Sequence, residues 1–178
     1  MEPTPGVVYW LTGLSGAGKS TLAECLTERL RSEKPNVIAL DGDVLRGIFK
    51  DGLGYDMASR EQLALRYARL TGELARQGSD VVVSTISLFP TVWQWCRTHI
   101  AHYRLIYVRV PMSVLAARDR KQIYSRAQRG ELSDVMGVDL PMVEPENPDL
   151  ILDNSGHRTP DALVDQLIQA FILKDKQS

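Results

Sequence analysis

The sequence predicts a single α/β domain, residues 1–178, with a five-stranded parallel sheet that carries helices on both faces. Short apolar runs alternate with amphipathic helical patterns along the whole chain, which indicates successive βαβ units. Near the N-terminus, residues 13–20 read Gly-Leu-Ser-Gly-Ala-Gly-Lys-Ser. That order matches the phosphate-binding loop, or P-loop, which joins a strand to a helix in one class of α/β proteins.

Composition narrows the functional classes. The chain has 44% hydrophobic and 24% charged residues and a formal net charge of -1, as in ordinary globular domains. This charge balance gives no basic surface for nucleic acid, and no apolar stretch is long enough to span a bilayer. Cys25 and Cys96 lack metal or disulfide spacing, and the first residues do not resemble a signal peptide. We therefore expect a cytoplasmic protein that binds neither nucleic acid nor membrane.

The first strand and helix frame the P-loop. Residues 7–11 form an apolar run rich in β-branched and aromatic side chains, which predicts a buried strand. Within the loop, we expect Gly13, Gly16 and Gly18 to adopt positive φ, so that successive N–H groups form an anion cradle. The helix that follows has its apolar face at Leu22, Ala23, Leu26 and Leu30.

The loop carries the chemistry of a nucleoside triphosphate site. Lys19 would bring a positive charge to the β- and γ-phosphates, and the Ser20 hydroxyl would bind Mg²⁺. A helix that begins near Lys19 adds the positive end of its dipole. The residues expected to bind the nucleotide are Gly13, Leu14, Ser15, Gly16, Ala17, Gly18, Lys19, Ser20 and Thr21.

Two carboxylates follow the second predicted strand, residues 36–40. Ligands of parallel sheets bind at the carboxyl ends of the strands, so Asp41 and Asp43 are expected to face the P-loop. Since Asp-Gly is also a common turn dipeptide, a solvated turn is the alternative interpretation. Arg46 follows in a short helical turn, before a glycine-bearing loop at residues 50–55.

The middle of the chain continues the alternation. A long helix is predicted from about Ser59, as N-cap, to about Gln77, with Gly78 ending it. Arg60 and Arg66 lie off its apolar stripe and are candidates only. Further strands are predicted at 80–87, with the polar end Ser84-Thr85-Ser87, and at 104–110, and helices at 90–100 and 114–118.

A basic segment, residues 118–129, comes next and holds Arg118, Arg120, Lys121, Arg126 and Arg129. A solvated helix face is one interpretation. A lid over about residues 119–131 is the favoured one, because phosphoryl transfer needs cations over the transferring group and exclusion of water. Beyond it, we expect a long loop at 133–148, a fifth strand at 150–153, a closing helix at 161–173 and a frayed tail.

Taken together, these motifs resemble the adenylylsulfate kinase family, whose members phosphorylate the 3′-hydroxyl of adenosine 5′-phosphosulfate. The likeness runs from about Val8 to Asp153, in the same order and spacing. It rests on residues 13–21, residues 40–43 with Arg46, residues 53–55 with Arg60, Ile86-Ser87, Arg118-Asp119 with Lys121 and Tyr124, Ala127, Gly130-Glu131, residues 137–139 and residues 144–146. The resemblance implies a P-loop kinase fold, with ATP and Mg²⁺ as cofactors and a homodimer as the assembly.

The same resemblance assigns roles in the site. It makes Asp43 the general base or orienter of the acceptor hydroxyl, supported by Asp41, and Tyr55 the counterpart of a phenylalanine that stacks on the substrate adenine. Ser87 stands where some members form a phosphoserine, and Arg118 lies near the ATP base. The catalytic residues would be Lys19, Asp41, Asp43 and Ser87, and the substrate would contact Asp43, Arg46, Tyr55, Arg60, Ile86, Ser87, Lys121 and Val135.

Departures from the family pattern gather where substrate is recognised. Leu63 and Val44 replace asparagines, and Leu88 replaces a proline. Ser133 and Val135 replace a lysine and the second aromatic ring that sandwiches the base. Losing a stacking ring weakens base binding by about 1 kcal/mol or more, and losing a lysine weakens the grip on an anion.

These departures leave the acceptor open. Adenosine 5′-phosphosulfate is the first choice, on the frequency of that activity in the family. The alternative is another capped nucleotide, such as the cytidine diphosphoramidate used in capsule polysaccharide modification. A nucleotide-binding regulator without catalysis is the lesser alternative; the retained Asp43 and the basic segment argue against it.

Overall fold

A computed structural model describes residues 3–49, 51–119 and 121–175 of the chain. Lys50, Arg120 and the last three residues of the predicted tail lie outside this described part. The strands are β1 (Val8–Thr12), β2 (Val37–Asp41), β3 (Asp80–Thr85), β4 (Tyr103–Arg109) and β5 (Leu150–Asp153). The helices are α1 (Lys19–Glu33), α2 (Gly42–Phe49), α3 (Met57–Arg76), α4 (Pro90–His99), α5 (Met112–Arg118), α6 (Ile123–Gln128) and α7 (Pro160–Asp175).

The five strands form one parallel sheet in the order β2-β3-β1-β4-β5, which confirms the predicted α/β class. Strand β1 lies at the centre, paired with β3 on one side and β4 on the other. All its side chains are buried, as a strand covered on both faces requires. The P-loop that follows β1 therefore emerges from the middle of the sheet's carboxyl edge.

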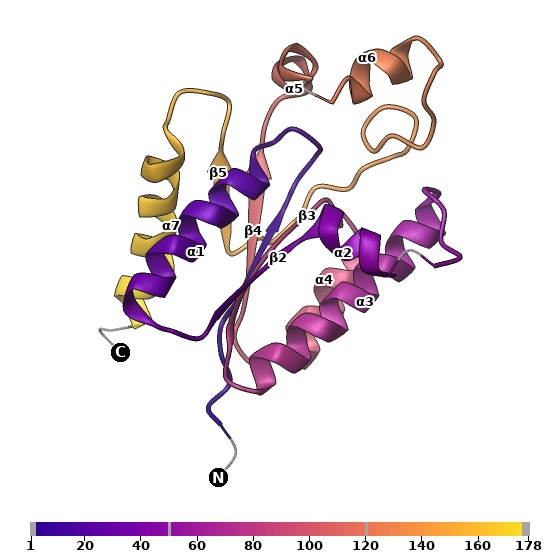
Figure 1. Ribbon diagram of the computed structural model, residues 1–178. Coiled ribbons are helices and arrows are strands. Elements are labelled where there is room, and N and C mark those ends of the chain that lie inside the picture. Colours follow the sequence, from indigo (N-terminus) through magenta and orange to yellow (C-terminus); the bar gives the residue numbers. More distant parts are fainter. Residues whose placement is uncertain (1–2, 50, 120, 176–178) are drawn as a thin grey trace.

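Helices cover both faces of the sheet (Figure 1). Helices α1 and α7 pack side by side on one face, and α3 and α4 pack together on the other. The predicted stripe of α1 is confirmed, because Leu22, Ala23, Leu26 and Leu30 are all buried. A layer of helices on each face allows the inner strands β1, β3 and β4 to be almost wholly buried.

Helix α3 begins two residues before the predicted N-cap, so the assignment of Ser59 was wrong. Asp56 is the N-cap, and its carboxylate accepts the Ser59 N–H at 3.0 Å and the Ser59 hydroxyl at 2.6 Å. Both residue types favour this position, and a carboxylate also interacts well with the positive end of the helix dipole. The predicted end of the helix is confirmed, since Gly78 has a φ of 92° directly after the C-cap Gln77.

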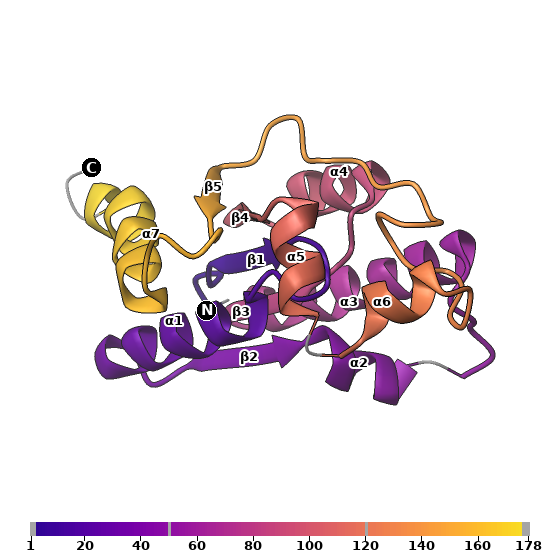
Figure 2. The same ribbon diagram turned by 90° about the horizontal axis from the view of Figure 1, so that it is seen from above.

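Short helices and loops collect above the carboxyl ends of the strands. Figure 2, a view from above, shows α5 over the end of β1 and α6 above α2. The long loop that follows α6 runs back across α4 toward β5 (Figure 2). No helix in the described ranges combines the length and the apolar character needed to cross a membrane.

Candidate active site

A cleft of about 1000 Å³ opens at the carboxyl edge of the sheet. Its walls come from the P-loop, the ends of β2 and β3, the start of α3, the basic segment and the loops after α6 and β5. Such a volume suits two nucleotides better than one small metabolite. The predicted site residues that line it are Ser15, Gly16, Gly18, Lys19, Ser20, Thr21, Asp41, Asp43, Arg46, Tyr55, Arg60, Ile86, Ser87, Arg118, Lys121 and Val135.

The P-loop glycines adopt the predicted backbone. Gly13, Gly16 and Gly18 have φ values of 154°, 77° and 89°. A Cβ on Gly13 would also lie 2.5 Å from the Val108 carbonyl oxygen of β4, so the loop can leave the sheet there only as glycine. Leu14 and Ala17 are buried beneath the cradle and support its shape.

Lys19 is held inside the loop, with only 9% of its surface exposed. Its Nζ donates to the Leu14 carbonyl at 2.8 Å, so the ammonium lies within the cradle. Burial lowers the pKa of Lys19 from 10.5 to about 8, although the carboxylates of Asp43 and Asp41 oppose the shift. A phosphate group beside the ammonium would reverse the effect by favouring the charged form.

ATP binding is therefore expected to take up a proton at about pH 8. In the free protein about half of Lys19 would be neutral at that pH, and the bound phosphates would protonate it. Calorimetry in buffers of different ionisation enthalpy measures this uptake, which should vanish at about pH 6.5 and below, where Lys19 is already charged. Lys19→Arg is the control, since arginine stays charged throughout. Equal uptake in that variant would assign the proton elsewhere.

Asp41, the last residue of β2, accepts hydrogen bonds on both carboxylate oxygens. The Ser20 and Ser84 hydroxyls donate at 2.7 and 2.9 Å, and the Asp43 N–H donates at 2.8 Å. Burial acts most strongly and would raise the pKa of Asp41, but these hydrogen bonds together outweigh it and hold the pKa below its usual value. An ionised carboxylate so placed orients Ser20 and is unsuited to taking a proton.

The donor set around Ser20 fits magnesium. Its hydroxyl proton points to Asp41, which leaves the oxygen lone pairs available to a hard cation. Within residues 3–49, 51–119 and 121–175, no cluster of three or more His, Cys, Asp or Glu could hold a metal. With its oxygen free, Ser20 could bind an ion that nucleotide phosphates hold on its other sides, as Mg²⁺ often is.

Asp43 reaches out from the start of α2 and is 78% exposed. Its Oδ2 lies 2.6 Å from Nζ of Lys121, which belongs to the basic segment. This ion pair bridges the cleft from the sheet edge to the predicted lid. An exposed pair of this kind contributes at most about 1 kcal/mol, so a ligand that attracts Lys121 can release Asp43.

Tyr55, Arg46 and Arg60 form one cluster in the cleft wall. The Arg46 guanidinium stacks on the Tyr55 ring with its Cζ 3.8 Å from the ring centroid, and Cζ of Arg60 lies 5.4 Å from it. Arg60 also donates to the Tyr55 and Asp134 carbonyls at 2.5 and 2.7 Å. Burial, and then the neighbouring Arg46, lower the pKa of Arg60. Arg66, the other candidate on this helix, instead donates to the Phe49 carbonyl at the end of α2.

Ser87 lies two residues beyond β3, which ends at Thr85 rather than at the predicted 87. The Ser87 side chain is buried, and its hydroxyl is 2.8 Å from that of Thr85. Nε1 of Trp93 donates to its carbonyl at 3.1 Å. Ile86 accepts the Thr12 hydroxyl on its carbonyl at 2.5 Å. The segment is thus packed against β1 and α4 and forms the floor of the cleft.

Val135 is buried, at 6% exposed, in a tight loop organised by Asp139. The Asp139 carboxylate accepts the Val135 N–H at 2.6 Å and the Asp134 N–H at 2.7 Å. The Val135 hydrogen bond is the main reason that the pKa of Asp139 is lowered. Asp134, with a φ of 60°, lines the cleft beside Val135.

The basic segment engages the cleft only in part. Arg118 and Lys121 line it, whereas Arg129 forms an ion pair with Glu131 at 2.6 Å. Tyr124 donates to the Ser15 carbonyl at 2.7 Å and so ties α6 to the P-loop. The Asp119 carboxylate accepts the N–H groups of Tyr124 and Ser125, an arrangement that caps the first turn of α6. Closure of this segment as a lid stays a prediction.

Sequence reasoning missed several cleft residues. Tyr67, Phe89 and Asn154 line the cleft, but the sequence offers no motif that would separate them from ordinary core or loop residues. Burial raises the pKa of Tyr67 to about 12, so its hydroxyl stays protonated and can donate to a ligand.

Comparison with known proteins extends these observations. The family model of adenylylsulphate kinase matches residues 5–153. A cytidine diphosphoramidate kinase of Campylobacter jejuni is 36% identical over 173 residues, 97% of this chain and 100% of that protein. An adenylyl-sulfate kinase of Deinococcus deserti is 41% identical over 147 residues, 83% of this chain and 81% of that protein. The structure of the APS kinase of Mycobacterium tuberculosis in complex with AMPPNP and APS has a TM-score of 0.86 at 32% identity, covering 96% of this chain and 99% of that chain.

Proposed function

This chain belongs to the adenylylsulfate kinase family of phosphotransferases, and from that premise we propose that it transfers the γ-phosphoryl group of ATP to a sugar hydroxyl of a capped nucleotide. A capped nucleotide here means one whose phosphate carries a further small group. The observation that carries the proposal is the meeting of the P-loop and the acidic pair in one cleft, with Ser20 bonded to Asp41 at 2.7 Å.

The residues divide the work of the transfer. Lys19 and the P-loop N–H groups bind the β- and γ-phosphates, and Asp41 orients Ser20 for the metal. Mg²⁺, when bound there, neutralises phosphate charge. Asp43 accepts the proton of the acceptor hydroxyl. At the same time the hydroxyl oxygen forms a bond to the γ-phosphorus of ATP, and the bond between that phosphorus and the ADP oxygen breaks. Lys121, once released from Asp43, would place its positive charge beside the phosphoryl group during the transfer.

Two acceptors remain, and one of them suits the cleft better. We assign the acceptor to the part of the cleft that Arg46, Arg60 and Tyr55 line, called the acceptor end below. Adenosine 5′-phosphosulfate stays a candidate because two of these residues are cations. Next to this cluster, however, the cleft is lined by the aliphatic Val135 and by Asp134, an acidic residue whose main-chain carbonyl accepts Arg60. A carboxylate repels a sulfate and accepts hydrogen bonds from an amine. We therefore favour a pyrimidine nucleotide with an amine-bearing cap, of which cytidine diphosphoramidate is an example.

The test is a side-by-side measurement of kcat/KM with the two nucleotides and Mg-ATP. We expect turnover of both, with cytidine diphosphoramidate preferred. A preference for adenosine 5′-phosphosulfate above about a hundredfold, near 2.7 kcal/mol of transition-state discrimination, would overturn the choice of acceptor. Phosphorylation of neither compound, nor of any of a broad nucleotide panel, would favour the regulator instead.

Val135→Phe is the matched variant for this comparison. A ring at position 135 would give the acceptor base a second aromatic face, so the ratio of kcat/KM should move toward adenosine 5′-phosphosulfate by about tenfold. Val143→Phe, at an exposed position of the same long loop, is the control and should leave the ratio unchanged.

The homodimer and the cytoplasmic location stay predictions. Light scattering of the purified chain tests the homodimer.

A further inference from the structure

Asn154, directly after β5, connects three parts of the nucleotide site, although no sequence motif marks it. Its Nδ2 donates to the Ala17 carbonyl of the P-loop at 2.8 Å. The main-chain carbonyl of Asn154 accepts a hydrogen bond from Nη2 of Arg118, the first residue of the basic segment, at 2.7 Å. Its N–H donates to the Arg109 carbonyl at 3.1 Å, which anchors it to β4.

The contact with Ala17 determines where the next N–H group points. In a planar trans peptide, the carbonyl of one residue and the N–H of the following residue point in opposite directions. Because Asn154 holds the Ala17 carbonyl, the Gly18 N–H is directed away from the Asn154 amide, and Gly18 lines the cleft together with Lys19 and Ser20. An anion in the cleft would meet that N–H.

The fit between Asn154 and the loop is close. A Cβ on Gly18 would lie 2.4 Å from Nδ2 of Asn154, and Gly18 has a φ of 89°. The backbone conformation favours glycine here, and any side chain would also displace the Asn154 amide from its place against the loop. The orientation of the amide follows from its partner, since a carbonyl oxygen can only accept and Asn154 must present its NH₂ group.

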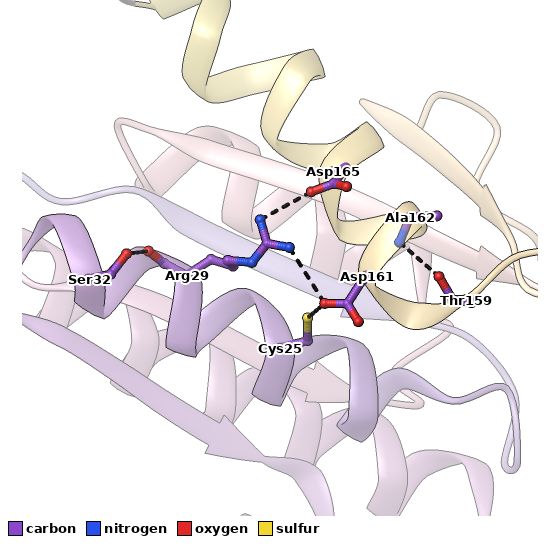
Figure 3. Close-up of polar contacts among 7 residues, drawn as sticks. All are labelled: Cys25, Arg29, Ser32, Thr159, Asp161, Ala162 and Asp165. Atoms are coloured by element: carbon purple, nitrogen blue, oxygen red, sulfur yellow. Dashed lines mark hydrogen bonds and ion pairs between the residues drawn. The ribbon is translucent and has the colours of Figure 1, made fainter.

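The other end of the loop after β5 is fixed by the docking of α7 on α1. Figure 3 shows Arg29 of α1 reaching across to Asp161 and Asp165 of α7, at 3.5 and 3.1 Å. The Cys25 thiol also donates to Asp161, at 3.3 Å (Figure 3). Since α1 begins at Lys19, the helix that extends the P-loop also holds the start of α7. Residues 154–160 are thus tied at both ends to the P-loop unit.

We propose that Asn154 is a positioning residue that orients the Ala17–Gly18 peptide toward the nucleotide phosphates and couples the P-loop to Arg118. The proposal rests on the ATP site of the proposed function. Loss of the Asn154 amide would leave Arg118 its main-chain partner but free the peptide to turn. Phosphate binding should therefore weaken while the acceptor end is unaffected.

The test uses the full chain and Asn154→Ala, with Ser155→Ala as the matched control. Ser155 lies in the same loop, donates a hydrogen bond to Asp153 at the end of β5, and does not line the cleft. We expect the Kd and KM for ATP to rise about tenfold in Asn154→Ala and the acceptor KM to change by less than about twofold. Asn154→Asp keeps the volume but sets an acceptor against the Ala17 carbonyl, so its ATP affinity should fall further. Ser155→Ala should bind ATP as the wild type does.

Two results would overturn this proposal and leave the proposed function standing. One is ATP affinity in Asn154→Ala equal to that of the wild type. The other is an equal rise of both KM values together with a lowered Tm, which would indicate general loosening of the fold. A wild-type chain that binds no ATP would overturn the proposed function, and this inference with it.

Discussion

Replacing Lys19 with methionine is expected to lower kcat/KM for the best acceptor by about a thousandfold or more. Methionine keeps most of the buried volume but removes the charge that faces the β- and γ-phosphates. Removing one preorganised donor from a transition-state site typically costs about a hundred- to a thousandfold, and groups that neutralise a transferring phosphoryl contribute as much or more. The Leu14 carbonyl would also lose the ammonium that it accepts at 2.8 Å.

Steady-state kinetics with Mg-ATP measure the effect. Lys34→Met is the matched control, because Lys34 is the C-cap at the other end of α1 and pairs with Asp80 at 2.8 Å, away from the cleft. That variant should keep wild-type turnover. Unchanged turnover in Lys19→Met would contradict the assignment of the P-loop as the phosphate site.

Replacing Asp43 with asparagine is expected to lower kcat by about a hundred- to ten-thousandfold, the range that general bases contribute. Asparagine preserves the shape and one acceptor oxygen but cannot take the hydroxyl proton. The KM for ATP should change little, because Asp43 lies at the mouth of the cleft, 78% exposed, and its partner is Lys121.

Two further variants, Asp43→Glu and Asp41→Asn, distinguish proton acceptance by Asp43 from the orientation of Ser20 by Asp41. Glutamate keeps the carboxylate, so part of the rate should return. Asp41→Asn removes the negative charge and one of the two oxygens that accept Ser20, Ser84 and the Asp43 N–H, so Ser20 is oriented less well. We expect it to raise the Mg²⁺ concentration needed for half-maximal rate. Equal loss of kcat in Asp43→Asn and Asp43→Glu would rule out proton acceptance by Asp43.

The sequence was most informative where function depends on contiguous residues. The P-loop could be predicted residue by residue, because positive φ at Gly13, Gly16 and Gly18 is a local property of glycine. The acidic pair could be placed at the carboxyl edge because the apolar run before it reads as a strand. In contrast, the N-cap of α3 was misplaced, since Asp56 and Ser59 both suit that position and only their mutual hydrogen bonds decide between them.

By itself, then, the sequence determined the parallel sheet, the P-loop at its central strand and the family, since each follows from short-range pattern and spacing. Contacts between distant residues were decided by the tertiary structure alone. Asn154 meets Ala17 across 137 positions, and Lys121 meets Asp43 across 78. Neither pair has a sequence signature, because the packing of β5 and of the basic segment around the cleft, and no local preference, brings the partners together.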